Sequence, residues 1–208
     1  MLQDLLKRIA NNEFQDTDLE KKFDEIAIEL LWHTKLIAGS QEYFIREIEF
    51  YFSSDHYKHM DPYAHKHRRQ LSLSQWYFHR YTSIDTYQNQ KFKGVDITFG
   101  NSQYNNFGGI LIRKIENKTR ITSGIGNIVN LIIKEIGAPK FEKLANDDLS
   151  VFDKNSPLRI ESFITSNTNR SIFKGPRIGL KAEKDQNDRF LKLNYNYFND
   201  IEYKIVAQ

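Results

Sequence analysis

The sequence contains no cysteine among its 208 residues, which excludes a disulfide framework and any thiolate metal site. Its absence fits a reducing compartment, so we expect a cytoplasmic protein. Long apolar runs are missing as well, since no window approaches the ~18 consecutive apolar residues that span a bilayer. The amphipathic N-terminus carries acids early and lacks the apolar core of a secretory signal. We therefore expect no membrane partner.

A strong excess of charge of one sign is also missing. Lys and Arg number 30 against 27 acids, so the net charge is only +3, and nucleic-acid binding would require positive charge gathered on one face. Aromatic residues, in contrast, are plentiful, with 15 Phe and 11 Tyr. We expect most of them in the core, with a few exposed rings available to stack on bases or to line a pocket.

The hydrophobic periodicity predicts a single α+β domain over residues 1–208. Two amphipathic helices in residues 1–33 should pack on a curved, mainly antiparallel sheet. A third helix is predicted at 123–137, and residues 61–79 are predicted to form a long irregular loop or a short helical piece. The predicted strands are 34–38, 44–52, 93–100, 108–116, 157–163, 176–182, 189–195 and 202–207.

Two acids interrupt an apolar and aromatic strand. Glu47 and Glu49 are two residues apart, so their side chains share one face of the strand. They fit a solvated rim beside Arg46, or a carboxylate held in an aromatic-walled pocket, where a raised proton affinity lets it activate a water. The spacing alone leaves both readings open.

Basic and imidazole side chains follow this strand. The run from His65 to Arg69 is flanked by Tyr63 and Trp76, a mixture of charge and aromatics that nucleic-acid surfaces use, although such runs are usually solvated. Zinc would accept the spacing of the histidines, but contacts to phosphates or bases and plain surface are equally open. These histidines are His56, His59, His65, His67 and His79.

Several short motifs then follow one another along the chain. They are Glu47-Ile-Glu49-Phe-Tyr51, Asp61-Pro-Tyr-Ala64-His65 with Arg68-Arg69, Ile110-Leu-Ile-Arg113, Gly124-Ile-Gly126-Asn127, Arg177-Ile178-Gly179 and Arg189-Phe190. In order and spacing, over roughly residues 16–195, this series resembles the alkyladenine (3-methyladenine) DNA glycosylase family.

The resemblance implies a role for each matched position. Glu49 corresponds to the general base, which would hold the nucleophilic water together with Arg113 and the backbone carbonyl of Ile178. Tyr51 and His65 would line the base pocket, where Tyr51 stacks on the flipped base and His65 donates a hydrogen bond to it. The resemblance implies no metal and no cofactor.

Further matched positions concern specificity and DNA contact. Asn106 falls where the family screens bases at the pocket mouth, and Phe99 falls where an aromatic wedge enters the minor groove. Arg68, Arg69 and the helix start at Gly124, Gly126 and Asn127 would contact the DNA. Asp96 stands where the family has a second stacking aromatic, and the helix start lacks the family's Pro and Lys.

We therefore expect a monomeric DNA repair glycosylase that binds double-stranded DNA with a damaged base, flips an alkylated or deaminated purine and hydrolyses its N-glycosidic bond with a Glu-activated water. A non-catalytic nucleic-acid-binding protein on the same scaffold is the alternative that Asp96 and the altered helix start suggest. A hydrolase of free nucleosides is a third possibility.

Overall fold

Ten strands form one sheet in this computed structural model, which describes residues 1–80, 86–164, 171–185 and 188–199, and each of their pairings is antiparallel. The main path runs β4 (Leu73–Arg80), β5 (Lys93–Phe99), β6 (Phe107–Glu116), β2 (Gln41–Ser54), β1 (Thr34–Ala38), β8 (Leu158–Ser162). Off this path lie β3 (His59–Met60), β7 (Ile121–Ser123), β9 (Phe173–Gly175) and β10 (Asn196–Phe198). Mixed helices and antiparallel strands confirm the predicted α+β class.

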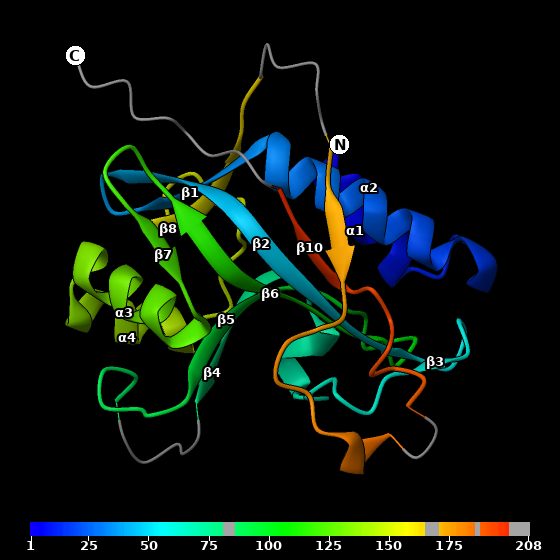
Figure 1. Cartoon of the computed structure of the whole chain (residues 1–208). Helices are drawn as coiled ribbons and strands as arrows, with labels where there is room; N and C mark the ends of the chain where they lie inside the picture. Colours follow the sequence, from blue (N-terminus) through cyan, green and yellow to red (C-terminus); the bar gives the residue numbers. More distant parts are fainter. Residues whose placement is uncertain (81–85, 165–170, 186–187, 200–208) are drawn as a thin grey trace.

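Among the described residues, four α-helices accompany the sheet: α1 (Leu2–Ala10), α2 (Leu19–Trp32), α3 (Ile125–Ile136) and α4 (Ala138–Asn146). In Figure 1, α1 and α2 lie at the right of the view and α3 and α4 at the left. The apolar stripe of α1 (Leu2, Leu5, Leu6, Ile9) is buried, as its spacing predicts. None of the helices within the described ranges is long and apolar enough to cross a membrane.

The long strand β2 separates an aromatic core from a polar face. Phe50 is fully buried and its ring stacks on Phe23 of α2, with 4.4 Å between the ring centroids. Because side chains alternate along a strand, Glu49 and Tyr51 point to the opposite face. Burial of Phe50 against α2 therefore fixes the register of β2 that turns the Glu49 carboxylate away from α2.

The predicted elements are confirmed where hydrophobic periodicity is strong, namely in α1, α2, α3, β1, β2, β5, β6 and β8. The prediction for 61–79 is partly wrong: a short 3₁₀ helix does form at Arg68–Leu71, but the second half of the segment forms β4. Helix α4 was not predicted. The strands predicted at 176–182 and 189–195 are also wrong, since neither segment forms a strand of the sheet, although the Tyr195 carbonyl accepts a hydrogen bond from the backbone N–H of Phe50 in β2. The strand predicted at 202–207 lies outside the described residues.

Candidate functional site

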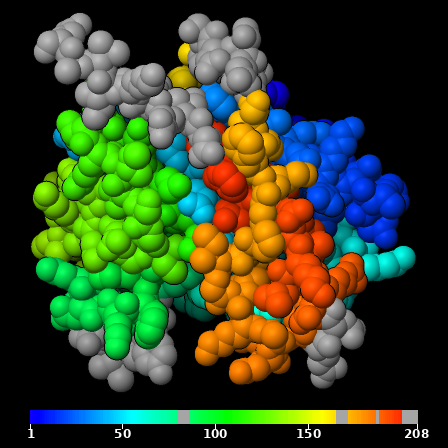
Figure 2. Space-filling view, in the orientation of Figure 1, coloured from blue at the N-terminus to red at the C-terminus, as the bar shows by residue number. Residues whose placement is uncertain are grey.

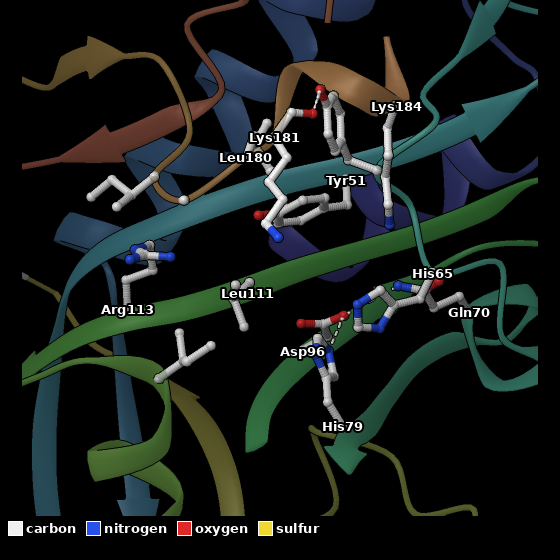
Figure 3. A pocket seen from close by; sticks show the side chains of 14 residues that line it. Tyr51, His65, Gln70, His79, Asp96, Leu111, Arg113, Leu180, Lys181 and Lys184 are labelled. Carbon is white, nitrogen blue, oxygen red and sulfur yellow. Dashed lines mark hydrogen bonds and ion pairs between the residues drawn. The ribbon is translucent and has the colours of Figure 1, made fainter. Parts of the chain in front are cut away.

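A cavity of about 440 Å³ opens on the polar face of β2, within the size range of small-molecule sites. Its floor comes from β2, β4, β5 and β6, and its other walls come from residues 63–70 and 178–184. Figure 2 shows the 178–184 segment, in orange, facing the green part of the chain across a furrow. The side chains shown in Figure 3 converge on this space, including Tyr51, Leu111, Arg113, Asp96 and Lys181.

Glu49 lies directly behind the cavity wall. Its side chain has no exposed surface and makes three hydrogen bonds: Oε1 accepts from the backbone N–H of Ile178 at 2.7 Å, and Oε2 accepts from the Tyr51 hydroxyl at 2.8 Å and from Nη1 of Arg113 at 3.1 Å. Tyr51, Arg113 and Ile178 line the cavity, whereas Glu49 does not. The carboxylate is therefore separated from the cavity by its own hydrogen-bond partners.

Burial raises the pKa of the Glu49 carboxyl, although the Ile178 N–H, the Arg113 guanidinium and the Tyr51 hydroxyl all favour its charged form. Burial raises the pKa of the Tyr51 hydroxyl as well, and the neighbouring Glu49 charge adds to the effect. Tyr51 therefore donates to Glu49 as a neutral phenol. A carboxylate with a raised proton affinity, held by fixed donors, is suited to general-base chemistry.

The segment that carries Ile178 is anchored by a buried ion pair. Both oxygens of Asp61 bind the guanidinium of Arg177, and neither side chain has exposed surface. Arg177 also donates to the backbone carbonyls of Phe50 and Phe190, each at 3.1 Å. This bidentate pair holds the chain next to β2, and so places the Ile178 N–H on Glu49.

Arg113 reaches Glu49 because the ladder between β2 and β6 is irregular. The register shifts between Ile45 and Ile48 leave Arg113 without a Cα partner, while Leu111 pairs regularly with Glu49. Such irregularities re-aim side chains. Glu47, the second acid of the strand, lies 3.7 Å from Nε of Arg113 and accepts a hydrogen bond from Asn196 at 3.1 Å. Glu47 therefore joins the same charged group, but does not line the cavity.

A second acidic corner lies on the cavity floor, around Asp96. Its side chain is fully buried, and Oδ2 lies 2.8 Å from Nε2 of His79 and accepts from Nε2 of Gln70 at 3.2 Å. The resemblance placed Asp96 in the base pocket, and the cavity includes it. Sequence reasoning missed Gln70 as a site residue, and it considered His79 only as one of five histidines that could bind zinc, phosphates or bases.

His65 lies at the cavity rim with its side chain open to solvent. Its Nδ1 is 3.5 Å from the Tyr77 hydroxyl. Surrounding protein and the nearby His79 lower the pKa of His65 to about 4, although Asp96 opposes this effect. The imidazole is therefore neutral at physiological pH and can donate one N–H or accept at the other nitrogen.

Two predicted site residues lie elsewhere. Phe99 has no exposed surface and packs between Phe52, at 5.2 Å between ring centroids, and Phe23, at 6.0 Å, so its prediction as a DNA wedge is wrong. Asn106 is likewise fully buried, and its amide donates to the carbonyl of Ala10 at the end of α1. Its prediction as a screen at the cavity mouth is wrong, because the amide ties the β5–β6 hairpin to α1.

Ile178 contacts Glu49 through its backbone N–H. The side chain is 53% exposed at the cavity rim. The N–H donor stabilises the charged carboxylate. The predicted role of the Ile178 carbonyl in holding a water stays a prediction.

The predicted DNA-contacting residues differ in what they bind. Arg68 is exposed, whereas Arg69 donates to the backbone carbonyls of Ala145, Asn146 and Asp147 and so caps the end of α4. The guanidinium of Arg69 is therefore engaged within the protein, and its contact with DNA stays a prediction.

The start of α3 lies beside the cavity, where Ile125 forms part of the wall. Gly124 precedes the helix with φ +92°, a conformation that favours glycine, and Gly126 is half-buried. Asn127 is exposed and donates from Nδ2 to the carbonyl of Ser123 at 2.9 Å. Gly124, Gly126 and Asn127 therefore stand together beside the cavity, next to Ile125.

The histidines do not gather into a metal site in the part of the chain that the structure describes, where no three His, Asp or Glu side chains are placed to share an ion. His59 is buried, and its two ring nitrogens bind the carbonyl of Phe52 at 2.8 Å and the hydroxyl of Tyr195 at 2.9 Å. Burial lowers the pKa of His59. Its role is to join β2 to the C-terminal segment.

Comparisons with known proteins add little to this picture. No protein-family model matches the sequence. An uncharacterized protein of Acanthamoeba polyphaga mimivirus is 29% identical over 212 residues, which covers 95% of this chain and 91% of the viral protein. The similarity extends over nearly the full length of both proteins, and the printed description of the relative names no activity.

Proposed function

We propose that the protein is a monofunctional glycosylase, which flips a damaged purine out of double-stranded DNA and hydrolyses its N-glycosidic bond. The observation that carries this proposal is the buried Glu49 carboxylate, held by three residues that line a cavity of nucleobase-compatible size. In this proposal the protein acts as a cytoplasmic monomer. The motif order shared with the alkyladenine glycosylase family supports it independently of the geometry.

The chemistry requires a base, a water and stabilisation of a sugar cation. A carboxylate offers about four acceptor positions, and three of those of Glu49 are taken by Ile178, Tyr51 and Arg113. The carboxylate has no exposed surface in this structure, so its remaining position would bind the attacking water after one of these partners moves aside. Glu49 then takes a proton from the water, whose oxygen bonds to C1′ of the sugar, while the glycosidic bond breaks and the base leaves with the bonding electrons. The charge of Glu49 stabilises the oxocarbenium-like sugar.

The site residues distribute the remaining tasks. The Tyr51 ring would stack on the base, and Arg113 would keep Glu49 ionised and oriented. Arg68 and the start of α3 would lie against the DNA backbone, where exposed cations and free helix N–H groups favour phosphates. The matched base position holds Glu49 rather than a lysine, so a Schiff base with the sugar is not part of the reaction, and the product is an abasic site.

Hydrolysis of a free nucleoside is the second candidate. It is favoured by the burial of Phe99 and Asn106, which removes both residues predicted to act at the mouth of a base-flipping pocket. A free nucleoside needs no wedge, because it has no stack to leave.

The test compares base release by the native chain and by Glu49→Gln from duplexes that carry hypoxanthine or an alkylated purine, and from the corresponding free nucleosides. We expect Glu49-dependent release from a duplex and little turnover of nucleosides. Turnover of nucleosides alone would favour the second candidate. Salt-sensitive duplex binding without release by either chain would leave a non-catalytic DNA-binding protein.

A further inference from the structure

We propose that the cavity selects a guanine-type base, meaning a purine that presents a ring N–H next to an exocyclic amino group. The selecting groups are Asp96 and Gln70 on the cavity floor. This inference rests on the proposed function, because it takes the cavity for a nucleobase site, and it adds the class of base that the site accepts.

Two buried acceptors on this floor have no donor. Within the described residues, Oδ1 of Asp96 and Oε1 of Gln70 have no hydrogen-bond partner, although the two residues are only 0% and 1% exposed. Nε2 of His79, 2.8 Å from Oδ2 of Asp96 as an ion pair, is likewise buried without a hydrogen bond in the described ranges. Asp96 and Gln70 both line the cavity. In Figure 3, Oδ2 of Asp96 is directed to His79 and Gln70, and the other oxygen points away from them, toward the Leu111 side of the cavity. Buried polar atoms are nearly always paired, so a ligand with N–H donors fits this corner.

The corner depends on a glycine of the neighbouring strand. Gly109 of β6 is the cross-strand partner of Tyr51, and a Cβ there would lie 2.5 Å from Oδ2 of Asp96 and 2.7 Å from Nε2 of Gln70. Any larger residue would therefore displace both side chains. The absence of a side chain at position 109 lets Asp96 and Gln70 meet next to the Tyr51 ring.

The number of acceptors separates the common purines. A carboxylate and an amide oxygen both accept, so two free acceptors call for two N–H donors on the ligand. Guanine presents its ring N1–H beside the 2-amino group, whereas hypoxanthine presents N1–H alone. Adenine presents an amino group beside an unprotonated ring nitrogen. That nitrogen is itself an acceptor, so it cannot form a hydrogen bond with either of the two free oxygens. Guanine therefore satisfies the corner most fully.

Guanosine and inosine test the proposal, because they differ only in the 2-amino group. We expect the native chain to bind guanosine about tenfold or more tightly than inosine in a calorimetric titration, the factor for one hydrogen bond to a charged acceptor. Asp96→Asn and Gln70→Met should each bring the two dissociation constants together. Gln103→Met makes the same chemical change at an exposed position outside the cavity and should keep the preference.

Thermal unfolding of each variant shows whether it is folded, and if Asp96→Asn fails to fold, Gln70→Met alone carries the test. Equal affinity for the two nucleosides, no binding of either, or a preference unchanged in Gln70→Met would overturn the proposal. Glu49-dependent release of hypoxanthine in preference to 7-methylguanine from duplexes would overturn it while sustaining the proposed hydrolysis. An Asp96-dependent guanosine preference without any base release would sustain the binding site and refute the hydrolysis.

Discussion

Replacing Phe99 by alanine should destabilise the fold strongly. The ring has no exposed surface and contacts Phe52, Phe23 and Phe50, with centroid distances of 5.2, 6.0 and 6.1 Å. Truncating a buried phenylalanine costs about 3–5 kcal/mol of the free energy of unfolding. Since domains are stable by only about 5–15 kcal/mol, this change removes a large part of the total. At about 2–4 °C per kcal/mol for a chain of this size, Tm should fall by about 6–20 °C.

Thermal and urea unfolding, followed together with binding of a hypoxanthine-containing duplex, measure this effect. Tyr104→Ala is the matched control, because Tyr104 lies on the hairpin that follows Phe99 and is 41% exposed. It should change the stability by no more than about 0.5 kcal/mol. If Phe99→Ala instead leaves Tm unchanged and weakens duplex binding, Phe99 is a DNA-contacting wedge and the burial described above is wrong.

Three further predictions concern the anchor, the base and the helix cap. Arg177→Met should lower the free energy of unfolding by about 3–5 kcal/mol in urea titrations, because it leaves the buried Asp61 without its partner. The rate of purine release should fall as the pH falls, with a midpoint above the ordinary carboxyl pKa of 4.5, because burial raises the pKa of Glu49. Once protonated, the Glu49 carboxyl cannot take a proton from the water. A midpoint below 4.5 would contradict this prediction. Arg69→Met should lower the free energy of unfolding by about 1.5–3 kcal/mol, because it removes the charged donor from the carbonyls at the end of α4. Arg68→Met, at an exposed position, should change the free energy of unfolding by no more than about 0.5 kcal/mol. Equal losses in the two variants would contradict the capping role of Arg69.

The sequence predicted the elements that carry their own periodicity. The stripe of α1 and the apolar residues of β2 are local patterns, and local patterns can be read without the partner that covers them. Strand β4 was not predicted because His79 lines the cavity while its neighbours Trp76 and Phe78 are buried in the core, so polar and aromatic residues mix as they do in a loop. The strands predicted at 176–182 and 189–195 were wrong for the opposite reason.

In that C-terminal part, apolar residues pack around a charge rather than along a sheet. The guanidinium of Arg177 lies over the rings of Tyr51, Tyr63 and Tyr195, with 4.6, 5.5 and 5.7 Å to the centroids. The same guanidinium donates a hydrogen bond to the backbone carbonyl of Phe190, and this bond holds the chain in an irregular turn. A long-range ion pair of this kind leaves no periodic signal, so the sequence suggested short strands where the structure has a loop.

For the site, motif matching placed Tyr51, His65, Asp96 and Arg113 at one cavity, and the structure brings those four residues together. The same matching misplaced Phe99, because the residue type fits both a wedge and a core and only burial distinguishes them. Gln70 was not predicted as a site residue because no local sequence pattern indicates its contact with Asp96, 26 residues away.

The most direct test of the proposed chemistry is the single-turnover rate of base release from a lesion-containing duplex at saturating protein, with the dissociation constant of the duplex measured in parallel. Glu49→Gln should slow release by about 100-fold or more while the dissociation constant changes little. Glu47→Gln should keep most of the rate, because Glu47 is hydrogen-bonded to Asn196 and lies 3.7 Å from Nε of Arg113, without a contact to Tyr51 or Ile178. Release by Glu49→Gln at the native rate would contradict the assignment of Glu49 as the base.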